Sequence, residues 1–539
     1  MKIGRLFFCI LLLMKKPASY LILLFYAFTL LSCANVEKYN RFIETPLVVE
    51  AMQRDINYVE HNLWKMHPDL FQYVREDLLK AKFDSLRFAI RQPLLPNQFQ
   101  LALASVLSEV RQGHMSLSPL IPKFDPQGKD KVRYQKSKGP FSQLGFHWQG
   151  NTLYLKKNGT MDSTLVLGSK ILAIEGIQPQ NLYTKYRPTF TSDGYNTTFT
   201  DQAFERLLPR YYQLELGYRD SIDILFSLGD STYQRTVVRK FEATEQKRKA
   251  GTDLVVIKKA NTPDSKKSDT KKQRKIFGYN ANLKRISKQL LFPVKGDSSV
   301  ALLKVADFSY GRPKEAYRRI FDRLALNSVQ YLILDLRGNL GGRLSDAREL
   351  YSYLVEEDKY QFIRPAVITS KFNLPFYQIK GLPGWSYPVL SPFIIPSAIV
   401  SWTKTFSKDG IKYTHLIGSK IEKSKTHRYR GRLFVLIDGG TFSAASLIAT
   451  NLKAGKRAIF VGEETGGAAG GTVAGSLPVL KLPNSHLRWR FGLMNIKPYF
   501  QVAEEGRGVM PDVPVVRSID DVITGKDPVM DKVLKSIGN

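Results

Sequence analysis

The sequence has 539 residues, of which 43% are hydrophobic and 24% charged, enough apolar material for two to four globular domains. The formal net charge of +32 favours an anionic partner, such as nucleic acid or a membrane surface. No nucleic-acid-binding motif accompanies this charge, so we expect no nucleic acid partner.

Cysteine and histidine usage bounds the chemistry further. The only cysteines, Cys9 and Cys33, lie in the N-terminal hydrophobic region, so no disulfide framework can stabilise the folded body. Thiolate metal sites are excluded for the same reason. The seven histidines show no paired ligand spacing, and we therefore expect no metal.

Residues 1–33 are predicted to be a targeting segment. Two apolar runs, Phe7–Met14 and Leu21–Leu31, are separated by lysines, and neither has the roughly 18 to 20 residues of a spanning helix. The run ends in Leu-Leu-Ser-Cys at Cys33, which resembles a bacterial lipobox, although an ordinary signal peptide remains the alternative. Lipidation of Cys33 would hold the protein at a membrane surface in the cell envelope.

Residues 34–120 have a helical pattern. Apolar residues recur at three- and four-residue spacing in Leu47–Met66 and Phe99–Val110, which predicts two helices. Gly113 is expected to cap the second helix, with His114 just beyond it. His114 either complements the helix dipole or acts as a positioned base, and the local sequence leaves both readings open.

Residues 121–240 are predicted to contain short strands and turns. The pattern from Leu144 to Gly176 resembles a PDZ domain, including its carboxylate-binding loop. PDZ domains bind a peptide C-terminus by strand addition, so the resemblance assigns Gly145 and Phe146 to substrate binding. The alternative is a β domain that serves only as a spacer.

The remaining sequence divides into a lysine-rich stretch and an α/β region. Residues 241–295 are lysine-rich and polar, which predicts a linker or a solvated insertion. In residues 296–539, strands at Val300–Val305 and Tyr331–Leu336 flank a helix at Pro313–Leu326. The second strand is almost continuously apolar, as expected for a strand buried on both faces of an α/β sheet.

Ser443 stands where a predicted strand turns into a helix. The strand is Leu433–Ile437, the helix Ser443–Leu452, and a second strand ends in the glycine-rich loop Thr465–Gly471. A serine hydroxyl at a helix N-terminus lies where negative charge is stabilised. Ser443 could equally be a simple helix cap.

Three motifs together resemble the S41 serine peptidases, which include the C-terminal processing proteases and the tricorn core proteases. They are the runs from Asp335 to Gly342, Thr441 to Ala445 and Gly462 to Gly467. The resemblance implies an α/β fold with a crotonase-like protease core, preceded by a helical region and a PDZ-like domain. It also implies a serine peptidase without a metal or organic cofactor, acting on protein or peptide substrates.

The resemblance further assigns the catalytic groups. Processing proteases activate the serine with a lysine, but that position is occupied here by Ala468-Ala469, and no lysine lies between residues 462 and 473. Tricorn-like members use a histidine and a glutamate, which match His114 and Glu505, with Glu504 as the alternative. Ser443 is then the nucleophile, His114 the general base and Glu505 its orienting group.

The tetrahedral oxyanion requires two backbone N–H donors. We expect one from Ala444 and the other from Gly341 or Gly342, because glycine permits close backbone approach. The sequence therefore predicts a serine endopeptidase of the cell envelope. One alternative is a non-catalytic lipoprotein that binds peptides or apolar ligands on the same fold. Another is a lipase or esterase, disfavoured because Ser443 lacks a Gly-x-Ser-x-Gly context.

Overall fold

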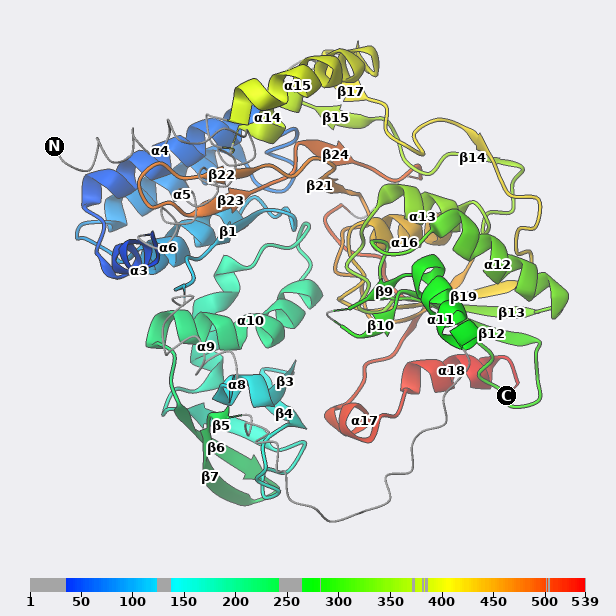
Figure 1. The fold of residues 1–539 in the computed structure, drawn as a ribbon, viewed down its shortest axis with the longest axis horizontal. Helices are drawn as coiled ribbons and strands as arrows, with labels where there is room; N and C mark the ends of the chain where they lie inside the picture. The colour runs from blue at the N-terminus through cyan, green and yellow to red at the C-terminus, as the bar shows by residue number, and fades with distance from the viewer. Residues whose placement is uncertain are drawn as a thin grey trace, which may run out of the picture.

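The computed structural model describes residues 35–123, 137–241, 264–281, 283–370, 374–380, 382, 386–500, 502 and 505–538 (Figure 1). Cys9, Cys33, Glu504 and residues 242–263 and 282 of the lysine-rich stretch lie outside these residues. Within the described ranges, no helix combines the length and the apolar character that crossing a membrane requires.

A six-stranded sheet forms the centre of the C-terminal half. Its order is β11 (Lys288–Leu291), β12 (Val300–Val305), β13 (Tyr331–Asp335), β19 (Arg432–Ile437), β20 (Ile459–Gly462) and β25 (Val513–Pro514). Neighbours are parallel except β11, which pairs antiparallel with β12. The carboxyl ends of β13 and β19 therefore lie side by side, and the loops that follow them meet at one edge.

Helices cover both faces of this sheet, which explains its apolar strands (Figure 1). One face packs in the main core with α12 (Pro313–Leu326), α13 (Leu344–Tyr351) and α16 (Ala444–Ala454). The opposite face contributes Ile333, Phe434 and Leu436 to a smaller core with α18 (Pro528–Ser536). The predicted strand Val300–Val305 and helix Pro313–Leu326 occur with the expected bounds.

Two further sheets connect the N-terminal helices to this core. The larger has the order β16 (Thr405–Lys408), β17 (Ile411–Thr414), β15 (Ala366–Ile368), β24 (Met494–Ile496) and β21 (Thr472–Ala474). The smaller has the order β1 (Ser116–Ser118), β23 (Arg488–Arg490) and β22 (Val479–Lys481). Because β1 pairs with β23, with Leu117 opposite Trp489, the segment just after His114 is fixed to the C-terminal half.

The N-terminal helices are α3 (Asn35–Glu44), α4 (Val49–Met66), α5 (Glu76–Ala89) and α6 (Pro96–Ser108). Their apolar faces share the main core with the six-stranded sheet. Helix α6 ends at Ser108, so Gly113 does not cap it as the sequence predicted. A Cβ on Gly113 would lie 2.5 Å from a ring carbon of Phe442, so glycine is needed there for close packing.

Residues 137–241 contain a sheet with a core of its own. The order is β3 (Leu144–Gln149), β4 (Thr152–Asn158), β5 (Lys170–Ile174), β6 (Ser221–Leu228) and β7 (Ser231–Val238), all antiparallel. Helices α9 (Pro179–Tyr186) and α10 (Thr198–Leu216) pack against it. β3, which carries Gly145 and Phe146, lies at the edge of this sheet.

The stretch predicted to be a linker or a solvated insertion forms regular elements in its described part. It contains α11 (Asp264–Phe277), β9 (Tyr279–Asn280), β10 (Arg285–Ile286) and the core strand β11. Buried Ile276 and Lys288 account for these elements, because each is fixed by contacts that the lysine-rich composition does not reveal.

The remaining elements are β2 (Ser137–Lys138), α8 (Pro140–Gln143), η1 (Arg187–Thr189), β8 (Lys240–Phe241), β14 (Lys359–Tyr360), α14 (Leu374–Ile379), α15 (Ser386–Thr403), β18 (Glu422–Lys423) and α17 (Ile519–Thr524).

A buried ion pair joins β11 to α13. Lys288 Nζ lies 2.8 Å from Asp346 Oδ2, and both side chains are 0% exposed. The Tyr317 hydroxyl donates to Asp346 Oδ1 (2.9 Å), and Lys288 Nζ donates to the carbonyl of Tyr310 (2.9 Å). Each charge is therefore stabilised by a counter-charge and by a second hydrogen bond, as a buried ion pair requires.

We expect Asp346→Ala to lower the free energy of unfolding by about 3–5 kcal/mol, because it leaves the Lys288 ammonium buried without a counter-charge. Denaturant unfolding measures this change. The matched control is Glu37→Ala, which breaks an ion pair to Arg41 whose side chains are 84% and 76% exposed. Its expected change is below about 0.5 kcal/mol. Equal changes in the two variants would contradict the role of the buried pair.

Candidate active site

Ser443 occupies a strained turn between β19 and α16. Its backbone angles are φ 57° and ψ −122°, a conformation that non-glycine residues rarely adopt. The Thr441 hydroxyl donates to the carbonyl of Leu336 (3.0 Å), which ties the turn to the end of β13. A sharp turn of this kind holds a serine hydroxyl clear of the sheet, at the end of the helix where its dipole is positive.

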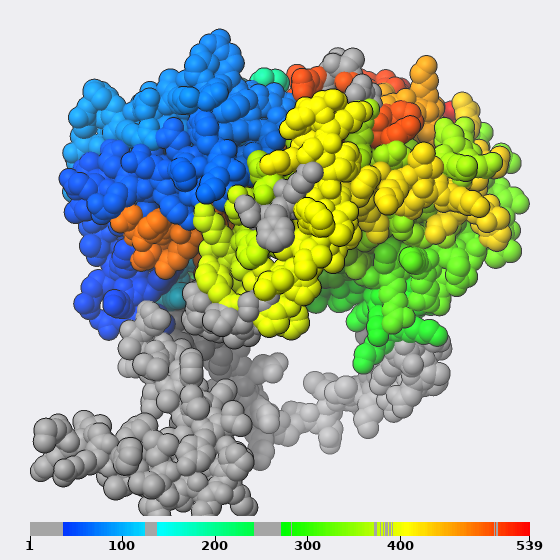
Figure 2. Space-filling view, turned by 90° about the horizontal axis from the view of Figure 1, so that it is seen from above, coloured from blue at the N-terminus to red at the C-terminus, as the bar shows by residue number. Residues whose placement is uncertain are grey.

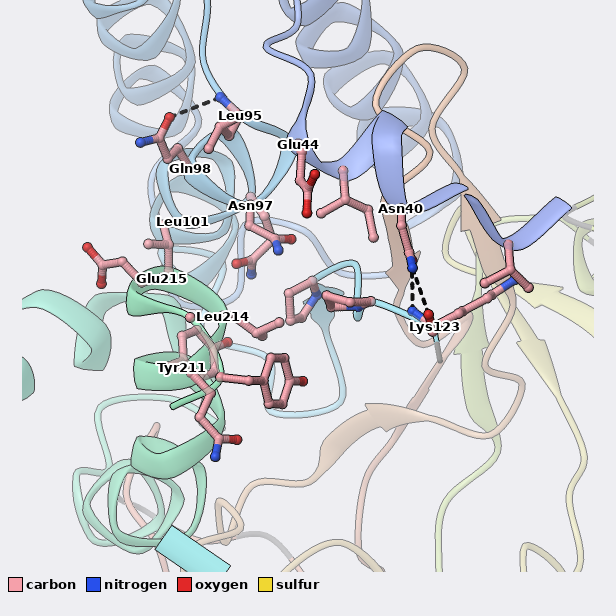
Figure 3. A pocket seen from close by; sticks show the side chains of 18 of the residues that line it. Asn40, Glu44, Leu95, Asn97, Gln98, Leu101, Lys123, Tyr211, Leu214 and Glu215 are labelled. Carbon is pink, nitrogen blue, oxygen red and sulfur yellow. Dashed lines mark hydrogen bonds between the residues drawn. The ribbon is translucent and has the colours of Figure 1, made fainter. Parts of the chain in front are cut away.

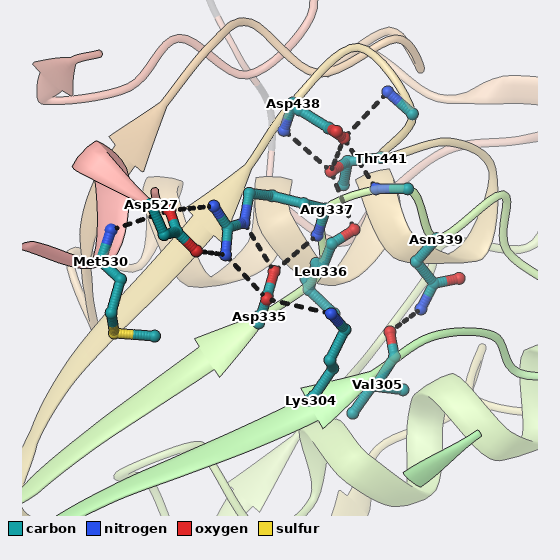
Figure 4. A network of polar contacts seen from close by, with 12 residues as sticks. Lys304, Val305, Asp335, Leu336, Arg337, Asn339, Asp438, Thr441, Asp527 and Met530 are labelled. Atoms are coloured by element: carbon teal, nitrogen blue, oxygen red, sulfur yellow. Dashed lines mark hydrogen bonds and ion pairs between the residues drawn. The ribbon is translucent and has the colours of Figure 1, made fainter. Parts of the chain in front are cut away.

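A network of charged groups fixes the neighbouring loop after β13 (Figure 4). Arg337 forms two-pronged contacts with Asp335 (2.9 and 3.0 Å) and with Asp527 (2.7 and 2.8 Å). Asp438 accepts hydrogen bonds from the N–H groups of Gly338 (2.8 Å) and Gly440 (2.9 Å). These contacts join the loops of β13 and β19 into one rigid unit.

The structure brings His114 and Ser443 together from positions 329 residues apart. His114 Nε2 lies 3.0 Å from Ser443 Oγ, which is hydrogen-bonding distance for a nucleophile and its base. The imidazole also packs against the Phe442 ring, with 4.9 Å between ring centroids. The side chains expected to be nucleophile and base are therefore positioned for proton transfer.

The other imidazole nitrogen faces Thr472 rather than a carboxylate. His114 Nδ1 lies 3.0 Å from Thr472 Oγ1, at the start of β21. Beyond the threonine lies Asp193, a buried carboxyl in the loop before α10. Asp193 Oδ1 accepts the N–H of Gly113 (2.7 Å), so the carboxyl also fixes the backbone next to His114.

The second oxygen of Asp193, Oδ2, makes no hydrogen bond of normal geometry among the described residues. The Thr472 hydroxyl and the Ala468 N–H nevertheless lie close enough to the carboxyl to lower its pKa. Asp193, Thr472, His114 and Ser443 thus form one polar chain. The sequence did not single out Asp193 or Thr472, because a Ser-Asp-Gly turn and a strand threonine carry no catalytic signal by themselves.

Burial governs the charge of this chain. Burial, with a smaller contribution from the charge of Arg490, lowers the pKa of His114 to about 4, so the imidazole is neutral near pH 7. Burial also raises the pKa of Asp193 to about 7, and hydrogen bonding only partly offsets this rise. A neutral imidazole can accept the serine proton. Because the groups of the polar chain interact, a proton added near pH 7 is shared among them and is not the property of Asp193 alone.

The backbone groups of Gly341 and Ala444, both proposed for the oxyanion hole, lie beside Ser443. A Cβ on Gly341 would lie 2.8 Å from Ser443 Cβ and 2.9 Å from the nitrogen of Ala444, and the φ of Gly341 is 91°. Glycine is thus required at this position. However, the Gly341 N–H already donates to Asn339 Oδ1 (2.9 Å). In the described chain, no acceptor is assigned to the N–H of Gly342 or Ala444.

The structure does not place Glu505 on His114. Glu505 is exposed, and the Nδ1 position it was expected to occupy is taken by Thr472. The loop is held in another way, since Tyr195 N–H donates to the carbonyl of Gly506 (2.7 Å) and Gly508 pairs with Ala468. The motif around Glu505 identified a loop that lies next to the site. It could not reveal which carboxyl group lies behind the imidazole. Glu504 lies outside the described residues.

The structure also shows the surroundings of Ala468-Ala469 and of the predicted substrate-binding residues Gly145 and Phe146. Ala468 and Ala469 are buried, and no hydrogen bond links a lysine amine to Ser443 among the described residues. The Phe146 side chain is packed in the core of its sheet, 6.0 Å from the Phe141 ring, so only backbone groups of Gly145 and Phe146 lie at the edge.

A large cavity lies away from the polar chain of Asp193, Thr472, His114 and Ser443. A cavity of about 870 Å³ opens between α3, α6 and α10, lined by residues such as Leu101, Tyr211 and Leu214 (Figure 3). No residue of the polar chain lines this cavity. Within the described ranges, no cluster of three or more His, Cys, Asp or Glu could hold a metal ion.

Comparison with known proteins supports a peptidase. Residues 299–515 match the family model described as Peptidase family S41. The structure of mature CPAF complexed with lactacystin aligns over 91% of this chain and 98% of CPAF, with 16% identity and a TM-score of 0.59. Mature CPAF aligns over 91% and 97%, with 15% identity and a TM-score of 0.58. At these identities the likeness shows a shared fold. No curated protein matches the sequence.

We expect the rate at which a fluorophosphonate modifies Ser443 to fall as the pH drops through about 7. A proton added to Asp193 reverses the hydrogen bonds of Thr472, so Nδ1 becomes an acceptor and Nε2–H faces the serine. Asp193→Asn should react slowly at every pH, without this step between roughly pH 5 and 8. A wild-type rate that is constant across this interval would contradict the role of the carboxyl.

Proposed function

We propose that this protein is a serine endopeptidase in which Ser443 is the nucleophile, His114 the general base, and Asp193 the group that orients His114 through Thr472. The 3.0 Å contact between His114 Nε2 and Ser443 Oγ, on a strained strand-to-helix turn, carries this proposal. The match of residues 299–515 to peptidase family S41 supports the same reaction class.

The first step transfers the serine proton. Before this step, the Asp193 carboxylate accepts a hydrogen bond from the Thr472 hydroxyl, and Thr472 Oγ1 accepts one from Nδ1–H of His114. The Nε2 atom of His114 is therefore unprotonated and can accept the proton of Ser443. As Ser443 Oγ bonds to the scissile carbonyl carbon, its proton moves to Nε2. The resulting imidazolium is stabilised by the Thr472 oxygen and, one hydroxyl further, by the negative carboxylate.

The second part of the reaction needs anion stabilisation and a leaving-group proton. The N–H groups of Ala444 and Gly342 are our proposed oxyanion donors, because the Gly341 N–H is already bound to Asn339. The imidazolium returns its proton to the leaving amine as the peptide C–N bond breaks, which leaves an acyl-enzyme on Ser443. Water then attacks the ester by the same route, and Ser443 is regenerated.

Substrate recruitment and location are part of the proposal. The edge position of β3 supports strand addition of a peptide beside Gly145 and Phe146, as the PDZ resemblance suggests. The Leu-Leu-Ser-Cys sequence supports lipidation at Cys33 and a place in the cell envelope. Protein or peptide substrates follow from the peptidase match.

Ser443→Ala should abolish fluorophosphonate labelling and lower peptide hydrolysis by about a thousandfold or more, because no other group can form the acyl-enzyme. Mass spectrometry of the labelled wild-type protein should place the adduct on Ser443. An unchanged thermal midpoint controls for folding. Labelling of the variant at another residue, or wild-type protein that cleaves no unfolded protein substrate, would overturn the proposal.

Thr472→Val should lower kcat roughly 10- to 100-fold with little change in KM, because it removes the hydroxyl that transmits the charge of Asp193 to His114. Thr472→Ser retains the hydroxyl and should restore most of the activity. Glu505→Gln is the matched carboxyl control, and we expect its kcat within about twofold of wild type. A large loss in Glu505→Gln with a normal rate in Thr472→Val would assign the orienting role to Glu505 instead.

A further inference from the structure

Helices α14 and α15 form an apolar projection that the proposed reaction does not use. They connect β15 to β16 at the outer end of the five-stranded sheet, and α15 runs along the top of the molecule (Figure 1). Seen from above, this segment protrudes between the N-terminal helices and the C-terminal half (Figure 2). The sequence of α15 has no charged residue and includes Pro392 and Pro396.

Most of the described apolar side chains of α15 face solvent. The exposed fractions are 73% for Phe393, 56% for Ile395, 51% for Ile399, 50% for Val400 and 58% for Trp402. Ile394 (8% exposed) and Ala398 (0%), one helical turn apart, hold the helix to the protein. A contiguous apolar surface of this kind marks an interaction site, because soluble proteins rarely leave one uncovered.

The segment that carries this apolar surface is rich in basic residues. Residues 359–408 contain no aspartate or glutamate, although they include Lys380, Lys404 and Lys408, and the next residue is Asp409. Lys404, directly after α15, and Lys408, at the end of β16, are both exposed. On the other side, Lys65 and Lys380 line a cavity of about 530 Å³ together with Ile394 and Ile395. Basic side chains therefore lie beside the apolar face, both next to the middle of α15 and just after its C-terminal end.

These features fit the surface of an anionic bilayer. Interfacial helices bury an apolar face at the headgroup boundary, while lysines contact lipid phosphates and aromatic residues lie at the headgroup level. Tyr387 and Trp402 stand near the two ends of α15, and both are exposed. β15 and β16 both pair with β17, so both ends of the segment are held at one sheet, and we expect α15 to lie on a membrane rather than to cross it.

A second copy of the chain fits this surface less well. A two-fold dimer through α15 would bring the same lysines of both copies together, and α15 itself has no acidic residue to neutralise them. A lipid surface supplies the opposite charge. We propose that the exposed face of α15 docks on an anionic lipid bilayer, with Lys404 and Lys408 binding lipid phosphate groups. The proposal uses only described residues and requires neither the peptidase reaction nor lipidation of Cys33.

Vesicle binding by the chain that begins at Ala34, which retains every described element, tests this docking. We expect it to sediment with phosphatidylglycerol-containing vesicles and to bind phosphatidylcholine vesicles much more weakly. Phe393→Ser and Trp402→Ser should each weaken partitioning roughly tenfold. Lys404→Gln and Lys408→Gln should each weaken binding to the anionic vesicles roughly fivefold.

Phe88→Ser is the matched control, because Phe88 is also 73% exposed but lies on α5, away from α15. It should bind vesicles as the wild type does. Hydrolysis of a soluble peptide should be equal in all of these variants, which separates docking from catalysis. The proposal is overturned if wild-type protein does not bind anionic vesicles, or if Phe88→Ser weakens binding as much as Phe393→Ser. A stable dimer in solution that Phe393→Ser dissociates, without vesicle binding, would also overturn it and assign the surface to a second copy.

Discussion

The proposed chemistry depends on one hydrogen bond between distant parts of the chain, from Ser443 to His114. Neither residue can hold the other in place alone, because Ser443 belongs to the central sheet and His114 follows an N-terminal helix. The antiparallel pairing of β1 with β23 and a shared apolar core fix the two parts to each other. The stability of that contact between the two halves is therefore also a condition for the chemistry.

The polar chain behind His114 shows how burial sets the charge of a proposed catalytic base. Low polarity keeps the imidazole neutral and ready to accept a proton, but it also raises the pKa of Asp193. The threonine hydroxyl between them can point its proton either way, so the protonation of the carboxyl decides which nitrogen of His114 carries hydrogen. The same buried environment that creates the base thus makes its tautomer sensitive to pH near neutrality.

Much of the fold and the central contact were predictable from the sequence. Apolar periodicity located β12, β13, α12 and α16, and the turn before Ser443 was recognisable from its glycines and the strand–helix change. The orienting group was not, because motif spacing led to Glu505 whereas the carboxyl behind His114 is Asp193, supplied by an unremarkable loop. Composition described residues 241–295 as a linker or a solvated insertion, and it did not reveal the buried Lys288, because that burial depends on a tertiary partner, Asp346. Side chains that act through non-local contacts leave no local signal.

The apolar face of α15 and the active site lie on the same rigid scaffold, because β15 and β21 belong to one sheet. Docking on a membrane would therefore hold the polar chain at a fixed orientation to the bilayer.

The central claim concerns the imidazole itself, and ¹⁵N NMR of His114, assigned by comparison with His114→Gln, tests it most directly. At about pH 8 we predict a neutral ring with hydrogen on Nδ1 and none on Nε2. A ring with hydrogen on Nε2, or a doubly protonated ring, would contradict this account.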